Sequence, residues 1–346
     1  MDDDEFRRHY RLSKNIVRWL CDELRDDAAL RRQRRARTVM TVEQQVLCAL
    51  RFYATGSYQG QVASDRHLAV HQTTVSACVR AVATAIVRRL GPRWIALPVT
   101  AVERAATQEA FLHRGSLPGV VGCVDGTFVA IKGPSKYDPT VTKALYWCRK
   151  LYYALNVMVV SDADLRILAI DPRMPGSTHD SYVWRRSWVR QECVAGHLVR
   201  HNEYLLALGT PAGQYNQAHA SMRAVVERCI GLLKSRFRCL HRHRTLYHHP
   251  KIAGTIVAAC AVLHNVCLCS GEAEPEPQSD SDSSSDEDND DEESADAARE
   301  RRGLQSRRLY SQGKSVRDRL VLQPSTTHLQ RVRDRLRRIR RRRQHR

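Results

Sequence analysis

The sequence predicts an α/β protein in which a helical region precedes a sheet-containing domain and a polar tail follows it. Apolar residues recur every three or four positions up to about residue 100, and from 119 to 206 they alternate or run continuously. They become sparse after residue 270. We therefore expect a helical region at 1–100, an α/β domain at 115–269 and a disordered tail at 270–346.

The helical region contains a segment with the layout of a helix-turn-helix. A short helix is expected near 59–63, and after a turn a second helix begins with Thr73 or Thr74 as its N-cap. The residues expected on the buried face of the second helix are Val75, Val79 and Val82. Those expected to face DNA are Gln72, Thr73 and Arg80. A plain pair of antiparallel helices fits the pattern equally well, so DNA binding is one of two interpretations.

The α/β domain begins with a strand followed by an antiparallel meander. Hydrophobic stretches of period two predict its first three strands, with a turn between the second and the third. The expected strands span 119–133, 150–162 and 166–172. After a helix that begins near residue 178, we expect a short fourth strand at 203–208 and a long amphipathic helix at 219–240. This order predicts a sheet flanked by helices.

Charge is distributed unevenly along the chain. The formal net charge is +19, yet residues 272–296 hold 13 Asp or Glu and no Lys or Arg, which leaves +32 on the rest. The end of the chain, 331–346, holds ten arginines. A body this basic favours a polyanionic partner, most simply DNA, and the basic end suits nuclear import receptors or phosphate backbones. An ordinary basic soluble protein has the same composition.

The sequence disfavours several classes of protein. The N-terminus, MDDDEFRRHY, has neither the basic nor the apolar part of a leader, and no run of eighteen apolar residues occurs, so we expect an intracellular protein outside membranes. Eleven scattered cysteines indicate reduced thiols rather than a disulfide framework. His264, Cys267 and Cys269 lie close together in an apolar helix, where core packing is favoured over zinc binding.

Two acidic residues lie within apolar segments of the α/β domain. Asp125 interrupts the first strand, in GVVGCVDGTFVAIK, and Glu227 lies among apolar residues of the long helix. Buried carboxylates need a cation, so a shared divalent metal such as Mg²⁺ is the simplest partner, and such a site supports phosphodiester hydrolysis. The basic residues expected to face DNA around it are Lys132, Lys234 and Arg236. Each of them fits an ordinary surface charge as well.

Four segments of the chain carry a resemblance to a known family. They are GVVGCVDGTFVAIKGPS, YYALNVMVVSDADLRILAIDPRMPGSTHDSYVW, YNQAHASMRAVVERCIGLLKSRFRCL and AACAVLHNVCL. Together they resemble the Harbinger transposase-derived nuclease family with its DDE-type endonuclease domain, and the resemblance covers about residues 5 to 269. It implies a ribonuclease H-like fold, DNA cleavage that depends on Mg²⁺ or Mn²⁺, a nuclear location and a Myb-like DNA-binding protein as partner.

The resemblance assigns catalytic roles residue by residue. Asp125 matches the family's first catalytic Asp, and Glu227 matches its final Glu. The middle Asp is absent together with a short stretch of chain, because residues 203–219 read EYLLALGTPAGQYNQAH. Asp180, in GSTHDSYVW, matches a His-Asp pair of the family and could supply a third metal ligand. A structural role is favoured over metal binding, because an early residue of a helix can accept backbone N–H bonds.

Three hypotheses about function follow. The chain is an active metal-dependent endonuclease whose site Asp180 completes, or it is a DNA-binding protein whose degenerate nuclease domain has lost turnover. In the third hypothesis the sequence is a splice or gene-model variant of an active nuclease that keeps the missing segment. Loss of a ligand favours the second and third, because too few oxygens remain to hold two ions. The sequence does not indicate an oligomeric state.

Overall fold

The computed structural model describes residues 1–31, 40–56, 71–115, 119–196, 198–199, 203–207 and 217–275. Three sequence predictions lie outside these residues: the helix near 59–63, the chain that follows the fourth strand at 208–216, and most of the tail at 276–346.

The chain ahead of the sheet is helical, as the sequence predicts. The described helices there are α1 (Asp3–Tyr10), α2 (Lys14–Leu24), α3 (Ala28–Arg31), α4 (Val42–Thr55), α6 (Gln72–Arg89), α7 (Gly91–Trp94) and α8 (Ala101–Gly115). Side chains satisfy the free amides at several helix starts. Thr41, for example, forms a capping box with Gln44 at the start of α4.

α6 is the second helix of the predicted helix-turn-helix. Its buried face is confirmed, and the residues on it are Val75, Val79 and Val82. The predicted N-cap is wrong: the cap is His71, whose side chain accepts a hydrogen bond from the Thr73 amide. His71 has the extended backbone of a cap, and its ring nitrogen replaces the hydroxyl oxygen that the sequence pattern favours.

Four strands form one sheet in the order β3-β2-β1-β4. They are β1 (Val120–Ala130), β2 (Ala154–Ser161), β3 (Ile167–Pro175) and β4 (Tyr204–Ala207). β1, β2 and β3 are antiparallel neighbours, whereas β4 runs parallel to β1. The predicted strands and the turn are confirmed. In the turn, the Asp162 carboxylate accepts hydrogen bonds from the amides of Asp164 (2.9 Å) and Arg166 (2.8 Å).

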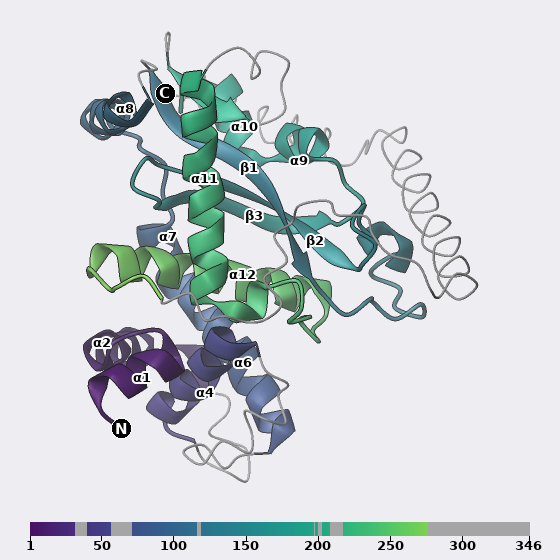
Figure 1. Cartoon of the computed structure of the whole chain (residues 1–346). Coiled ribbons are helices and arrows are strands. Elements are labelled where there is room, and N and C mark those ends of the chain that lie inside the picture. Colours follow the sequence, from purple (N-terminus) through teal and green to yellow (C-terminus); the bar gives the residue numbers. More distant parts are fainter. Residues whose placement is uncertain are drawn as a thin grey trace, which may run out of the picture.

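Different helices cover the two faces of the sheet (Figure 1). α11 (Gln217–Arg236) packs on one face together with α8, and there Val226 of α11 shares a core with Val159 of β2. α9 (Asp180–Arg186) and α10 (Trp188–Val194) serve the other face, where Val183 packs in a second cluster with Met158. Successive strand residues point to opposite faces, so neighbouring residues of β1 meet different helices.

α12 (Pro250–Cys269) joins the helical region to the sheet, close to the 3₁₀ turn η4 (Arg238–Leu240). It packs against α6 and β3, and it contributes to a single core that also contains Leu20, Val79 and Val159. The regions expected at 1–100 and 115–269 thus share one core. By length and composition α12 could span a membrane, but 72% of its apolar window is buried inside the protein, as in a core helix.

Asn265 of α12 closes the outer edge of β3. Its side-chain oxygen accepts from the Ile167 amide at 2.8 Å, and its Nδ2 donates to the carbonyl oxygens of Ile167 (2.8 Å) and Trp94 (2.7 Å). The carboxamide therefore bonds β3 as a neighbouring strand would, and it satisfies backbone groups that an edge strand otherwise exposes. Because Asn265 is 3% exposed, water cannot take over these bonds easily.

Candidate active site

Asp125 lies at the centre of β1, where the strand is only partly covered. The strand is buried from Val120 to Val124, half-buried from Asp125 to Phe128, and buried again at its end. The Asp125 Oδ1 accepts a hydrogen bond from the Gly126 amide at 2.7 Å. Asp125 stands opposite Val159 in the β1–β2 register, and its side chain therefore points to the face that α11 covers.

Glu227 lies on α11, on a helical stripe that reaches β1 through Lys234. The Lys234 Nζ donates to the Phe128 carbonyl oxygen at 3.2 Å. Glu227 precedes Lys234 by seven residues, which make nearly two full helical turns. The two side chains therefore lie on the same side of α11, about 10 Å apart along its axis. Asp125 precedes Phe128 by three strand residues, also about 10 Å. Figure 1 shows α11 lying across β1 on one face of the sheet. Glu227 itself is exposed, so its predicted burial among apolar residues is wrong.

Asp180 lies on the opposite face of the sheet from Asp125. A Cβ added at Gly126 would stand 2.5 Å from the Asp180 Oδ1, so this carboxylate covers Gly126 directly. The same oxygen accepts from the Nδ2 of Asn156 at 2.7 Å. Gly126 and Asp125 are consecutive in a regular strand and face opposite ways. The sheet therefore separates the two carboxylates, and the structure does not bring Asp180 to Asp125 as a third ligand.

β4 brings the chain to the edge of the site without a carboxylate. It pairs with β1 so that Ala207 lies opposite Val124, next to Asp125. The sequence contains no Asp or Glu between Glu203 and Glu227, so this segment supplies no middle acid.

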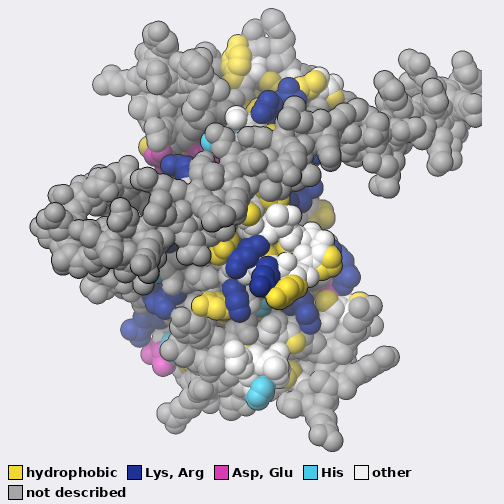
Figure 2. Space-filling view, turned by 90° about the vertical axis from the view of Figure 1, so that its right-hand side faces the viewer, with side chains coloured by type: hydrophobic (Ala, Val, Ile, Leu, Met, Phe, Trp, Pro, Cys, Tyr) yellow, Lys and Arg dark blue, Asp and Glu magenta, His cyan; other side chains and the backbone are white. Residues whose placement is uncertain are grey.

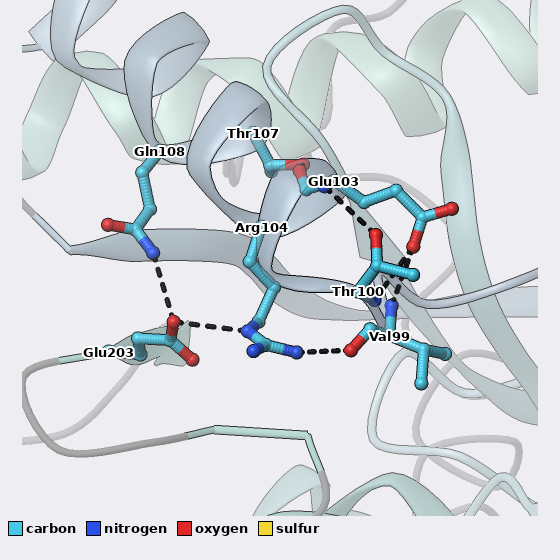
Figure 3. Close-up of polar contacts among 7 residues, drawn as sticks. All are labelled: Val99, Thr100, Glu103, Arg104, Thr107, Gln108 and Glu203. Atoms are coloured by element: carbon cyan, nitrogen blue, oxygen red, sulfur yellow. Dashed lines mark hydrogen bonds and ion pairs between the residues drawn. The ribbon is translucent and has the colours of Figure 1, made fainter.

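The start of β4 is fixed by a buried ion pair with α8 (Figure 3). Arg104, which is 2% exposed, donates through Nε to the Glu203 Oε1 at 3.1 Å and through Nη1 to the Val99 carbonyl oxygen. The Nε2 of Gln108 donates to the same Glu203 oxygen at 3.2 Å. These bonds hold the start of β4 against α8, which packs on β1. Sequence reasoning missed the pair, because its partners are 99 positions apart and neither belongs to a motif.

The predicted DNA contacts have different surroundings. Gln72, Thr73 and Arg80 are exposed on α6. Lys132 is exposed just beyond the end of β1, with its Nζ 5.7 Å from the centre of the Tyr247 ring.

The prediction for Arg236 needs correction. Arg236 is 2% exposed, so its side chain does not face solvent or DNA, and its Nε and Nη2 have no hydrogen-bond partner within the described structure. It lies in the last turn of α11 and acts electrostatically on Cys267 of α12. The amphipathic pattern of α11 indicates one buried side of the helix. It cannot reveal that α12 covers a second side, the one that carries Arg236.

His264 and Cys267 are packing residues, as the sequence predicts. Both are fully buried, and the His264 Nε2 lies 2.8 Å from the Leu165 carbonyl oxygen. Burial lowers the pKa of His264 to about 4 and so keeps the ring neutral near neutral pH. Cys269, by contrast, is exposed.

A metal site would have to be built from Asp125 and Glu227. Across the described ranges, no group of three or more His, Cys, Asp or Glu residues is placed to hold a metal ion. Mg²⁺ prefers oxygen donors and often binds through one or two carboxylates while keeping several waters. Two carboxylates supply donors for one divalent ion at most, and they are too few for the pair of ions that two-metal cleavage requires.

Comparisons with known proteins identify the class and then the family. A family model described as DDE superfamily endonuclease matches residues 124–265, which run from β1 into α12. The α/β domain is thus similar to the endonucleases of the DDE superfamily. Relatives named "Putative nuclease HARBI1" from Bos taurus, Homo sapiens and Xenopus laevis are each 30% identical over 282 residues, which cover 77% of this chain and 78% of each relative.

The chain therefore belongs to the Harbinger transposase-derived nuclease family, and with it to the enzymes that act on nucleic acid. No solved structure was found to match it.

Proposed function

We propose that this chain is a metal-dependent DNA endonuclease with a reduced site, in which Asp125 and Glu227 hold a single Mg²⁺ or Mn²⁺. The observation that carries the proposal is the hydrogen bond from Lys234 to the Phe128 carbonyl oxygen, because it sets the stripe of Glu227 along the face of β1 that bears Asp125. A bound divalent ion would activate water and polarise the phosphodiester. The basic body of the protein would attract the DNA.

The chain's own residues would position the reacting groups. The Gly126 amide orients the Asp125 carboxylate, and the Lys234 ammonium adds positive charge where a phosphate would approach. Because the middle acid is missing, the ion would be held by fewer oxygens than in a three-acid site. We therefore expect weak metal binding and slow cleavage, with a dependence on millimolar rather than micromolar metal.

The proposed fold family, DNA-binding segment, location and protein partner rest on the sheet topology, on exposed residues and on the family resemblance. The strand order, with an antiparallel meander and a parallel fourth strand beside β1, supports a ribonuclease H-like fold. Exposure of Gln72, Thr73 and Arg80 on α6 supports the helix-turn-helix interpretation. The nuclear location and the Myb-like partner follow from the resemblance to the family, and the basic end at 331–346 supports the location.

A second candidate function is DNA binding without turnover. The absence of any Asp or Glu between Glu203 and Glu227 favours it, because this segment then supplies no third carboxylate to the site. Such a protein would keep its basic surface and its fold. It would bind duplex DNA with an affinity that falls steeply with salt.

A plasmid-nicking assay distinguishes the two functions. Supercoiled DNA is incubated in Mg²⁺ or Mn²⁺ with the wild type, with Asp125→Asn, with Glu227→Gln, and with Asp180→Asn as a matched control on the opposite face. We expect slow nicking by the wild type and the control, and none by the two site variants. Full nicking by Asp125→Asn would show that the site lies elsewhere.

The assay also decides for the second candidate. If the wild type nicks in neither ion while it retards duplex DNA in a salt-dependent way, DNA binding without turnover replaces the first proposal. Sequencing the transcript across codons 200–215 tests the splice or gene-model hypothesis, because a longer product would contain the missing segment.

A further inference from the structure

A pocket of about 440 Å³ opens at the far end of β1 from Asp125. Three segments form it: the end of β1, the segment that leads into β2, and the turn after η4. Backbone hydrogen bonds join them, from the Ile131 amide to the Tyr153 carbonyl oxygen and from the Lys132 amide to the Leu246 carbonyl oxygen, each 2.9 Å. The walls are therefore held in place before any ligand arrives. We call this site the β1-end pocket; its principal lining residues are Lys132, Trp147, Tyr152, Tyr153, Arg242 and His243.

The lining combines aromatic rings with cations. Trp147 packs edge-on against Tyr153, with ring centres 4.8 Å apart. The Arg242 guanidinium lies over the Tyr152 ring at 5.1 Å. The residues that line the pocket include no Asp or Glu. On the side of the molecule seen in Figure 2, Lys and Arg side chains gather with hydrophobic side chains between them.

One polar atom of the wall has no partner. The Trp147 Nε1 is buried and donates no hydrogen bond within the described structure. Because this donor is closed to solvent, a ligand in the pocket meets the tryptophan ring rather than its N–H group. The pocket therefore suits a ligand that has a flat ring and also carries negative charge.

We propose that the β1-end pocket receives an unpaired nucleotide of the DNA that the nuclease domain binds, so this inference rests on the proposed function. The base would lie against the tyrosine and tryptophan rings. Its phosphate would contact Lys132 and Arg242, which are exposed at the rim. Stacking on aromatic side chains and cations along the backbone are how proteins hold unpaired nucleotides.

The position of the pocket predicts where the unpaired nucleotide lies. Lys132 follows Asp125 by seven residues, which is about 23 Å of strand. One strand of duplex DNA advances about 3.4 Å per nucleotide. With the DNA backbone running along β1, the unpaired nucleotide would lie about six or seven positions from the phosphodiester beside Asp125.

Binding in EDTA tests the proposal separately from cleavage. The probe is a hairpin duplex with one unpaired 2-aminopurine, compared with the fully paired hairpin. Anisotropy gives the two affinities, and 2-aminopurine fluorescence reports stacking. We expect the wild type to prefer the unpaired probe by about fivefold or more and to quench it, as one stacked base allows. Arg242→Ala, Tyr152→Leu and Trp147→Phe should each reduce the preference.

The chain provides a matched control, since Arg185 also lies over a tyrosine ring, that of Tyr182, at 5.9 Å and outside the pocket. Arg185→Ala and Tyr182→Leu should keep the full preference. The proposal is overturned if the wild type binds both probes equally, if it binds neither, or if the pocket variants keep the preference. A competition experiment with polyglutamate gives one more outcome that would overturn the proposal. If polyglutamate displaces DNA from the wild type but not from Arg242→Ala, and the unpaired base is not preferred, the pocket binds an acidic protein segment instead.

Discussion

Replacing Gly126 by alanine tests how the acids are arranged across the sheet. The added Cβ would stand 2.5 Å from the Asp180 Oδ1 and 2.8 Å from its Cγ, too close for non-bonded atoms. Asp180 must move and lose the hydrogen bond from Asn156. Overpacking costs about 1–3 kcal/mol and a lost hydrogen bond to a charged group about 1.5–3 kcal/mol. Since movement relieves part of the clash, we expect the free energy of unfolding to fall by about 2–4 kcal/mol.

A double-mutant cycle isolates the contact. Asp180→Ala alone should cost about 1–2 kcal/mol, because the Asn156 Nδ2 keeps its bond to the Thr178 carbonyl oxygen at 2.8 Å. In Gly126→Ala/Asp180→Ala the new methyl group has room, so the double variant should recover at least about 1 kcal/mol relative to the sum of the single losses.

Urea unfolding followed by tryptophan fluorescence measures these free energies. Gly231→Ala on α11 is the control, because its Cβ would meet nothing within 4 Å and the change should stabilise the helix by about 0.5–1 kcal/mol. Strictly additive losses in the cycle would refute the reasoning. They would mean that Asp180 does not cover Gly126, and the separation of Asp125 from Asp180 by the sheet would lose its support.

Three further predictions concern other parts of the molecule. Arg104→Met should lower stability by about 3 kcal/mol, because it leaves the partly buried Glu203 charge without its cation; an unchanged melting temperature would contradict this. The pKa of His264 is about 4 in the folded protein, below its unfolded value, so neutral His264 contributes fully to the free energy of unfolding above about pH 6.5. As the pH falls towards 4, the free energy of unfolding should drop by up to about 3 kcal/mol. His264→Gln should flatten that part of the stability curve in urea titrations at several pH values. Arg80→Ala should weaken duplex binding and reduce the salt slope by about one without changing the melting temperature, and an unchanged slope would remove Arg80 from the DNA contacts.

Local patterns predicted the secondary structure well. The alternation in β1, β2 and β3 is a direct result of strand geometry, so the strands and their connecting turn could be located from the sequence. Their ends were predicted too long, since residues such as Lys150 and Lys132 continue the pattern without pairing in the strands. The N-cap of α6 was missed because histidine is rarely a cap.

Long-range packing was beyond the reach of the sequence patterns. Arg236 belongs to a basic run that resembles a DNA-binding surface, yet α12 buries it. In the sequence, Asp180 resembles a possible third metal ligand. Only the β1–β2 register and the contact with Gly126 show that it lies on the face of the sheet opposite Asp125. The ion pair between Arg104 and Glu203 likewise depends on the tertiary fold. Helix and strand periods report which side of an element is apolar, and they carry no information on what covers it.

The Asn265 carboxamide has a consequence for how this protein could change during evolution. Asn265 occupies the edge of the sheet at β3. The other edge strand, β4, is then where the described sheet can be extended. β4 stands at that open edge, and it leads into the segment that lacks the acid expected from the family resemblance. Grafting a short acidic loop after Ala207 would then be a repair that needs no redesign of the core.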